Sequence, residues 1–382
     1  MWGMTTTRVF EGLAGVLVAR TELSSVEGES GRLSVRGRAI ESLVSAVPFE
    51  AMLGLLLEGA VPEPSRLAAL QAELGEARVR AHACLESRFE AVAAPDAMTT
   101  LRSALSLLPN DAAPCDALAM AAVATAAWIR RARGGQLPAP EPGLPHAQDL
   151  LKMLSGGAGK ERAARLLDAY LVTVAEHGFN ASTFAARVTA STGADLPSAV
   201  VAGVATLSGP LHGGAPGPVL DMLDAVASAE RANDYVRAEL AAGRRIMGMG
   251  HRVYRVRDPR AFVLERALSA YQSGHGGTAR LALARAVEAA ATAELARKYP
   301  ERALRANVEF YTALLLEALD IPRAAFTAIF ACARVAGYAA HYAEQRRTGR
   351  LIRPSALYVG PNSESPPVEG SDKRAFGVGV SF

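Results

Sequence analysis

Helical periodicity is the feature that most limits what this chain can fold into. Residues 166–174 carry apolar side chains at the spacing of one helix face. Residues 281–298 are alanine-rich and hold no glycine or proline, and residues 324–347 place Ala, Phe, Ile and Val along an inner face. The alternation typical of strands is rare, and we find it only at residues 16–22 and 33–36. These patterns predict a mostly helical protein with short strands near its start.

Composition and charge exclude several classes of protein. Half of the residues are apolar and 21% are charged, which excludes a disordered chain. With 382 residues, the chain is long enough for two or three domains, or for one large domain with an inserted lobe. A net charge of +3 is too small for a polybasic nucleic-acid-binding protein. The absence of a sequence repeat argues against a solenoid.

Cysteine use and hydropathy indicate the compartment. Cys84, Cys115 and Cys332 cannot all pair and have no CxxC spacing, which favours buried thiols in a reducing compartment. The longest nearly apolar run, residues 117–129, is shorter than the roughly 20 residues that a membrane helix requires. We therefore expect a soluble, cytoplasmic protein that does not enter a membrane.

Turn-forming residues divide the helical pattern. Residues 134–146 are rich in proline and glycine and predict a surface connection, and residues 273–278 predict a flexible turn. Gly178 is placed to end the helix expected at residues 166–174. The tail after Tyr358 is rich in Pro, Gly and Ser, and we expect it to be extended.

Three of the seven histidines lie in polar or glycine-rich surroundings where chemistry could take place. They are His177, His212 and His251, and none of the seven has the close spacing of a metal site, so we expect no metal. A lone histidine more often caps a helix or binds a core carbonyl. A turn around His212, however, would let its ring donate to an oxyanion. Gly248 and Gly250 would let the backbone approach a ligand before His251, and no strand precedes them, which excludes a Rossmann phosphate loop.

Six segments occur in an order that resembles the citrate synthase family, which includes the methylcitrate synthases. They are GLAGVLVARTELSSVEGESGRLSVRG, EHGFNASTFAARVTAST, SGPLHGGAP, IMGMGHRVYRVRDPRA, NVEFY and RLIRPSALYVGP. The resemblance covers nearly the whole chain, from Gly12 to about Pro361. It implies an all-α, two-domain fold that is active as a homodimer. The implied large domain is residues 1–216 and 323–382, and the implied small domain, residues 217–322, closes over the substrate.

The implied reaction joins an acyl-CoA, above all acetyl-CoA, to oxaloacetate, and water then releases citrate and CoA. The CoA thioester is a co-substrate, and no tightly bound cofactor is implied. The family motifs give His212 the hydrogen bond to the thioester carbonyl and His251 the polarisation of the oxo acid's ketone. Glu309 stands at the position of the base that removes the α-proton. His177 would contact the polar groups of the oxo acid.

The same motifs also imply which charged residues of the chain bind the substrates. The two carboxylates of oxaloacetate call for arginines, which bind a carboxylate through two parallel N–H donors. The matching positions are Arg260, Arg334 and Arg353, and in the family the last reaches into the partner subunit's site. An arginine on its own could equally form a surface or interface ion pair. The resemblance places CoA against loop backbone and one cation: Ile246, Gly248, Gly250 and Arg255.

Glu309 is the main departure from the family, which carries aspartate as the base. Glutamate adds one methylene, or about 1.5 Å of reach, and a displacement of about 1 Å can cost roughly a hundredfold in rate. Milder departures fall at five other positions: Asp96 and Ala97, which precede Met98 where the family commonly has His-Pro-Met, and Pro216, Gly217 and Ser355. These changes leave several functions open. The protein could use acetyl-CoA, or use a longer acyl-CoA to make 2-methylcitrate or another 2-alkylcitrate. It could also be a weakly active paralogue that binds CoA or an oxo acid, or an enzyme that cleaves a citryl thioester.

Overall fold

The computed structural model describes residues 9–13, 15–44, 46–157, 160–212, 216–273 and 278–360. Contacts divide the chain into two units. The smaller holds the terminal segments, Met1–Val18 and Arg353–Phe382, and the larger is Ala19–Ile352. Every candidate site residue except Arg353 therefore belongs to the larger unit.

Helices make up most of the described chain, as the apolar periodicity predicts. The α-helices are α1 (Ile40–Leu43), α2 (Phe49–Glu58), α3 (Pro64–Glu86), α4 (Phe89–Val92), α5 (Ala97–Leu105), α6 (Pro114–Ala132), α7 (His146–Ser155), α8 (Glu161–Val174), α9 (Ala181–Ser191), α10 (Leu196–Leu207), α11 (Pro216–Val226), α12 (Ala232–Ala241), α13 (Pro259–Gln272), α14 (Thr278–Lys298), α15 (Val308–Ala318) and α16 (Phe326–Thr348). Single 3-10 turns are η1 (Glu11–Leu13), η2 (Ala229–Arg231) and η3 (Arg323–Ala325).

A small antiparallel sheet lies near the start of the larger unit. Its strands are β1 (Ser24–Glu27), β2 (Arg32–Val35) and β3 (Arg38–Ala39), in that order across the sheet. The strand predicted at residues 33–36 is confirmed to within one residue, whereas the strand predicted at residues 16–22 is wrong. Glu27 pairs with Arg32 across the turn at residues 28–31, so the partner of β2 must end at the turn. Residues 16–22 lie too far from that turn to pair.

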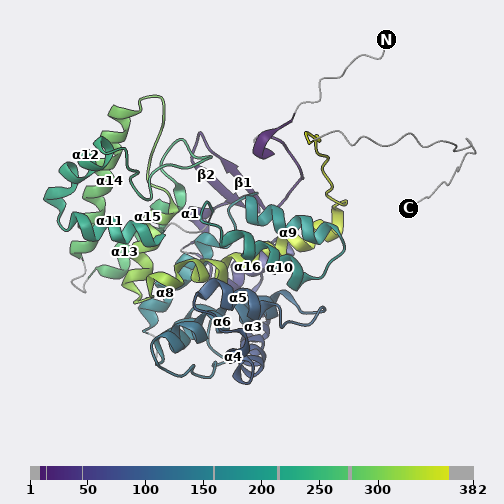
Figure 1. The fold of residues 1–382 in the computed structure, drawn as a ribbon. Helices are drawn as coiled ribbons and strands as arrows, with labels where there is room; N and C mark the ends of the chain where they lie inside the picture. Colours follow the sequence, from purple (N-terminus) through teal and green to yellow (C-terminus); the bar gives the residue numbers. More distant parts are fainter. Residues whose placement is uncertain are drawn as a thin grey trace, which may run out of the picture. The chain divides into compact units, whose positions relative to one another are not determined.

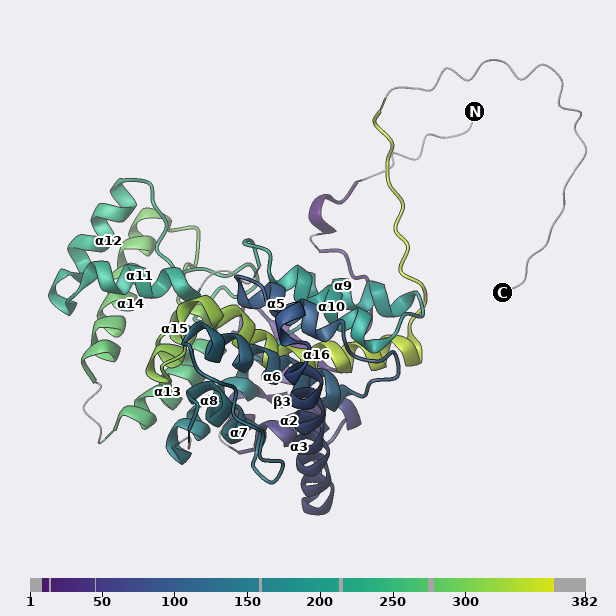
Figure 2. The same ribbon diagram turned by 60° about the horizontal axis from the view of Figure 1, so that its bottom comes forward.

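Helix α16 runs through the middle of the larger unit (Figures 1 and 2). It packs against α6, α9 and α10, and residues 331–340 are all buried. Helix α6 contains the apolar run at residues 117–129, and this run is wholly buried. Burial of each large apolar side chain contributes roughly 1.5 to 3 kcal/mol, so these two helices hold much of the core together. In the part of the chain that is described, no helix combines the length and hydropathy needed to cross a membrane.

Gly337 lets the end of α8 approach α16 closely. A Cβ atom at this position would lie 2.5 Å from the carbonyl oxygen of Ala175 and 2.6 Å from Oε2 of Glu176. Only glycine avoids that overlap. On a helix, residues three and seven positions apart share a face, so Arg334, Gly337 and His341 face the same way. The bare backbone at Gly337 therefore allows Glu176 to approach both Arg334 and His341 on α16.

Helices α11, α12 and α14 lie together at one side of the unit, on the left in Figure 1. Helix α12 packs against α14, while α13 packs against both α8 and α15. The long loop between α12 and α13 returns from this group toward the central helices and carries the segment IMGMGHRVYRVRD. The fold thus brings a glycine-rich loop from the outer group beside the first turn of α15.

Several predicted boundaries change in the structure. Helix α8 ends at Val174, so Gly178 does not terminate it as predicted; it adopts a φ of 95° in the following loop. The connection predicted at residues 134–146 stops at Pro145, because His146 is buried and begins α7. Helix α16 begins after the turn η3. Part of the turn predicted at residues 273–278, namely 274–277, lies outside the described residues, as does the tail beyond residue 360.

Candidate active site

Arg260 is held at the start of α13 by Asp258. The Asp-Pro-Arg sequence favours a helix start, because aspartate caps the first turn and proline suits the first helical position. Asp258 accepts from the backbone N–H of Arg260 at 2.9 Å, and from its Nε and Nη2 atoms at 3.0 and 2.7 Å. It also accepts from the backbone N–H of Val308 at 3.1 Å. Both side chains are almost fully buried, so this pair locks α13 to α15.

His251 presents its Nε2 atom beside Arg260. Its Nδ1 atom accepts hydrogen bonds from the backbone N–H groups of Val253 and Tyr254, at 3.0 and 3.1 Å. The proton of the neutral ring must therefore sit on Nε2, which lies 3.4 Å from Nη2 of Arg260. Burial and the charge of Arg260 lower the pKa of His251 to about 4, although Asp258 opposes this. The ring is thus a neutral donor near pH 7, next to a fixed cation.

Glu309 lies in the first turn of α15, whose start is tied to the His251 loop. Asn307 caps the helix by accepting from the backbone N–H of Glu309 at 3.0 Å. The side chain of Asn307 donates to the Gly250 carbonyl at 2.9 Å, and its backbone N–H donates to the Gly248 carbonyl at 2.9 Å. Gly248 has a φ of 72°, and a Cβ there would lie 2.9 Å from the Phe310 ring, so glycine is required.

The environment of Glu309 suits a proton acceptor. Burial raises the pKa of this carboxyl to about 7; Asp258 adds to the rise, and Arg260 opposes it. A general base works best when its pKa lies near the working pH, because it is then both ionised and basic. The charge of Arg260 acts on Glu309 as well as on His251, so these three predicted residues belong to one cluster.

His212 is anchored by a serine that the sequence analysis did not single out. Its Nε2 atom lies 2.7 Å from Oγ of Ser182, which also lies 2.7 Å from Oδ1 of Asn180, the N-cap of α9. The single hydroxyl proton of Ser182 can serve only one of these acceptors. When it goes to His212, the ring proton sits on Nδ1 and can be donated to a ligand. Burial and the charge of Arg252 lower the pKa of His212, so the ring is neutral near pH 7.

Arg334 is the most unusual group in the site. It is fully buried on α16, and none of its three guanidinium nitrogens has a hydrogen-bond partner among the described residues. Its nearest carboxylate is Glu176, at 4.0 Å between Nη1 and Oε2. Burying a charge without hydrogen bonds costs several kcal/mol, in order-of-magnitude terms. Arg334 therefore has the donors to bind an anion that enters the site.

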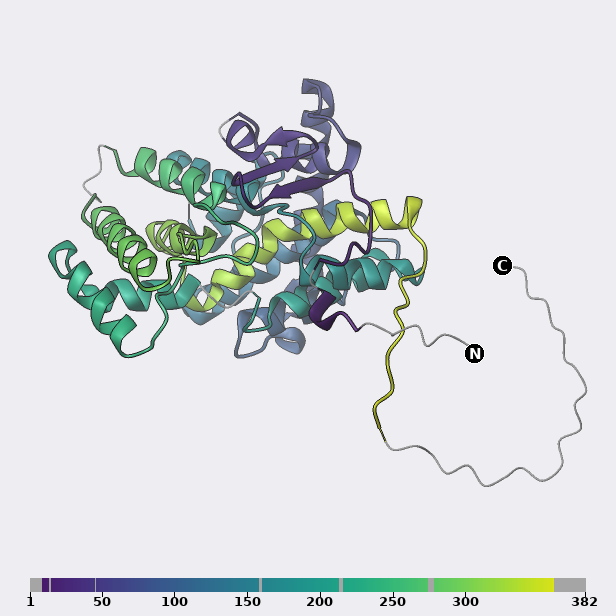
Figure 3. The ribbon, with the colours of Figure 1, turned by 90° about the horizontal axis from the view of Figure 1, so that it is seen from above.

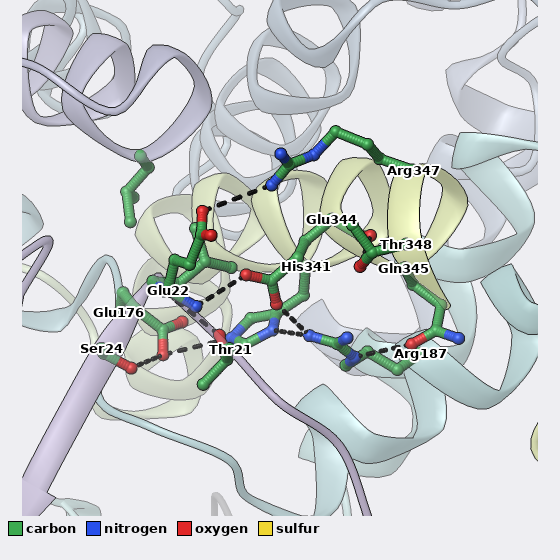
Figure 4. Close-up of polar contacts among 12 residues, drawn as sticks. Thr21, Glu22, Ser24, Glu176, Arg187, His341, Glu344, Gln345, Arg347 and Thr348 are labelled. Atoms are coloured by element: carbon green, nitrogen blue, oxygen red, sulfur yellow. Dashed lines mark hydrogen bonds and ion pairs between the residues drawn. The ribbon is translucent and has the colours of Figure 1, made fainter. Parts of the chain in front are cut away.

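Glu176, the carboxylate nearest to Arg334, belongs to a buried polar network. Figure 4 shows this network, which runs from Ser24 through Glu176 and His341 to Arg187. It accepts from the hydroxyl of Ser24 at 2.8 Å and lies 3.3 Å from Nε2 of His341. The Nδ1 atom of His341 accepts from Arg187, which also pairs with Glu344. Burial opposes ionisation of Glu176, but His341, Arg334 and Ser24 outweigh it and lower the pKa of the carboxyl to about 2. A permanent carboxylate thus lies behind Arg334.

His177 shares an aromatic neighbour with Arg334. Its ring meets the Phe330 ring edge to face at 5.9 Å between centroids, and Cζ of Arg334 lies 5.1 Å from the centre of the same ring.

Of the residues matched to CoA, Ile246 is buried and Arg255 is exposed. Arg353 is exposed and belongs to the unit of the terminal segments. Among the described residues, no group of three or more His, Cys, Asp and Glu side chains could hold a metal ion.

Comparison with known proteins identifies the family to which this fold belongs. A family model described as "Citrate synthase, C-terminal domain" matches residues 12–355. Citrate synthase from Synechocystis is 37% identical over 95% of this chain and 94% of its own length. The enzyme of that name from Haloferax volcanii is 37% identical over 91% of this chain and 95% of its own. The crystal structure of citrate synthase from Thermotoga maritima has a TM-score of 0.83 and 32% identity, and covers 96% of this chain and 100% of its own.

The chain therefore belongs to the citrate synthase family. It is an enzyme of the citrate synthase type, and the all-α fold predicted from the sequence is confirmed.

Proposed function

We propose that this enzyme condenses acetyl-CoA with oxaloacetate and water to give citrate and CoA, without a bound metal or tightly bound cofactor. The observation that carries this proposal is the buried guanidinium of Arg334, none of whose nitrogens has a hydrogen-bond partner among the described residues. Oxaloacetate offers two carboxylates for Arg334 and Arg260, and a ketone oxygen for the Nε2–H of the neutral His251. His177 shares the Phe330 ring with Arg334 and would contact the polar groups of the same substrate.

Each candidate residue then has one role in the reaction. Glu309 removes a proton from the acyl α-carbon while Nδ1–H of His212 donates to the thioester oxygen, giving an enol or enolate. The α-carbon attacks the ketone carbon of oxaloacetate, whose oxygen accepts the hydrogen bond of His251. Water then cleaves the citryl thioester, so that acetyl-CoA, oxaloacetate and water become citrate and CoA.

The binding groups complete the proposal. CoA would lie against the backbone of Ile246, Gly248 and Gly250, with Arg255 near its phosphates. Residues 217–322 would form a small domain that closes on the large one. We also propose a homodimer in which the partner supplies Arg353 to the oxo acid. Substitution of Arg353 by alanine should then raise the oxaloacetate requirement strongly, and a fully active monomer would contradict this part of the proposal.

A longer acyl-CoA is the second candidate, and it would yield 2-methylcitrate or another 2-alkylcitrate. It is favoured by the glutamate at position 309, whose extra methylene moves the carboxylate by about 1.5 Å. An acyl group whose α-carbon lies further from the backbone of residue 309 would suit the longer side chain of glutamate. A weakly active binding paralogue is the third, but it gives no reason for a carboxyl with a pKa of about 7 in the α15 turn.

One assay separates these functions. CoA release is measured with acetyl-, propionyl- and butyryl-CoA, each with oxaloacetate. We expect the highest kcat/KM with acetyl-CoA; a preference for propionyl- or butyryl-CoA would replace citrate by a 2-alkylcitrate. Absence of CoA release with all three, from protein that is folded by circular dichroism, would support the binding paralogue.

A further inference from the structure

The turn of the β1–β2 hairpin presses against the loop that carries His251. A Cβ atom at Gly28 would lie 2.2 Å from the carbonyl oxygen of Val253, and the Gly28 carbonyl accepts from the backbone N–H of Arg255 at 2.9 Å. At Gly31, a Cβ would lie 2.4 Å from Cγ2 of Val256. Both glycines of the turn are therefore in contact with the loop at distances that no side chain allows.

The strand β1 touches the other loop that carries a candidate histidine. Cγ2 of Val26 would lie 2.7 Å from a Cβ at Gly178, the residue after His177. The hydroxyl of Ser24 donates to Glu176, the residue before His177, at 2.8 Å. One strand and its turn thus contact two loops that are more than 70 residues apart in the sequence.

The hairpin is itself firmly anchored. Leu23, Leu33 and Val35 have no exposed surface, and the backbone N–H of Arg36 donates to the Leu23 carbonyl at 2.9 Å. Figure 3 shows the sheet above the central helix α16, to which Glu344 ties it by accepting from the backbone N–H of Glu22 at 2.8 Å. The hairpin is therefore a fixed reference against which both loops are placed.

We propose that the β1–β2 hairpin, residues 24–35, is a positioning element that fixes His251 relative to His177 and Arg334 in the reacting geometry; the catalytic part of this inference rests on the proposed function. Its residues touch no substrate. They act through the backbone of the two loops, so the two halves of the oxo-acid site keep their spacing.

The geometry predicts a large effect from a single methyl group. Alanine at Gly28 must move the Val253 backbone by about 1 Å to restore van der Waals contact, and a displacement of this size can lower the rate roughly a hundredfold. The same movement stretches the hydrogen bond from Arg255 and exposes the amides of Val253 and Tyr254, which bind His251.

The test compares Gly28→Ala and Gly31→Ala with two matched controls. Gly143→Ala has open space around it and controls for Gly28→Ala. Gly37→Ala lies in the other turn of the same sheet, at a φ of 77° against 66° for Gly31, and has nothing within 4 Å; it carries the backbone strain without the contact. Adding Val256→Ala to Gly31→Ala removes the Cγ2 methyl group that the new Cβ atom at position 31 would overlap. The double substitution should therefore restore part of the lost turnover.

Three readouts are taken on folded, full-length protein: kcat and KM, the ¹³C shift of the ketone carbon of bound oxaloacetate, and amide hydrogen exchange of residues 249–258. We expect Gly28→Ala to lower kcat roughly a hundredfold, to move the ketone shift toward that of free oxaloacetate and to speed exchange, while both controls match wild type. Unchanged exchange, or faster exchange with wild-type kcat and ketone shift, would overturn the proposal. Absence of turnover in wild type would refute the proposed function, and the exchange comparison would still decide whether the hairpin holds the loop.

Discussion

Arg260 and Arg334 are two equally buried arginines in opposite electrostatic situations. Arg260 forms a two-point pair with Asp258, whereas Arg334 has no hydrogen-bond partner among the described residues and a carboxylate no nearer than 4.0 Å. The paired arginine joins helices α13 and α15 and orients its neighbours. The unpaired one keeps its donors free. The comparison shows that burial alone does not tell how many donors of an arginine remain for a ligand; the state of its protein partners does.

The largest expected effect concerns the cluster around the paired arginine, Arg260, because this cluster also contains the proposed base, Glu309. Glu309→Gln keeps the shape of the side chain and removes its basicity, so exchange of acyl-CoA α-protons with solvent should fall roughly a thousandfold. Oxaloacetate binding, measured by calorimetry, should persist because Arg334 is unchanged. Near-normal proton exchange in this variant would remove Glu309 from the role of base.

Methionine at each arginine sharpens the comparison directly. Arg334→Met should raise the KM for oxaloacetate roughly a hundredfold. It should change the unfolding free energy only slightly, because the cost of burying a charge without hydrogen bonds is removed while Glu176 loses one of the groups that stabilise its charge but keeps Ser24 and His341. Arg260→Met should instead lower that free energy by about 3 to 5 kcal/mol, because Asp258 loses its partner. Urea unfolding and steady-state kinetics measure the two effects. Equal destabilisation by both substitutions would show that the arginines do not differ as described.

The pH dependence of kcat/KM tests the carboxyl of Glu309 through a smaller effect. A base with a pKa of about 7 must be ionised to act, so kcat/KM for the acyl-CoA should fall about tenfold for each pH unit below 7. Since burial raises this pKa from 4.5, ionisation opposes folding: the carboxyl's contribution to stability is present below pH 4.5 and is lost as the pH rises through 7. Glu309→Gln should abolish that component. A flat rate profile from pH 5 to 8 would contradict the assignment.

The smallest effect concerns the proton of His212. Ser182→Ala removes the hydroxyl that lies 2.7 Å from Nε2, so the ring can hold its proton on either nitrogen. We expect roughly a tenfold loss in kcat with little change in KM for oxaloacetate, in keeping with one hydrogen bond. Thr206→Ala removes a hydroxyl that donates to the Ala202 carbonyl within its own helix, and serves as the control. A loss in Ser182→Ala confined to KM would point to substrate binding instead.

Local patterns predicted the helical fold, because apolar periodicity and helix-capping residues are features of short segments. The candidate site residues came from the family motifs instead. Asp258 caps α13 and Pro259 occupies its first position, and both residue types favour a helix start locally. Partners far apart in the sequence could not be predicted this way. Ser24 and Glu176 are 152 residues apart, and Ser182 and His212 are 30 apart. Each of these pairs depends on how helices pack, and no local periodicity encodes it.

The incorrect prediction of a strand at residues 16–22 also arose because a local pattern does not determine which segments pair. Alternation of side chains is weak evidence over so few residues, while the turn at residues 28–31 sets the pairing register of both strands. The glycines of that turn were visible in the sequence, but their contact with the Val253 loop is tertiary and appears only in the structure.

Gly337 carries a consequence for how this protein tolerates variation. It has no side chain to react or bind, yet every other amino acid there would overlap the carbonyl oxygen of Ala175 at 2.5 Å. In a library of all single substitutions selected for growth, position 337 should be as intolerant as the catalytic positions. A map of intolerant positions would then include a residue that matters because it lacks a side chain. Mutational sensitivity alone would wrongly assign such a residue to the catalytic site.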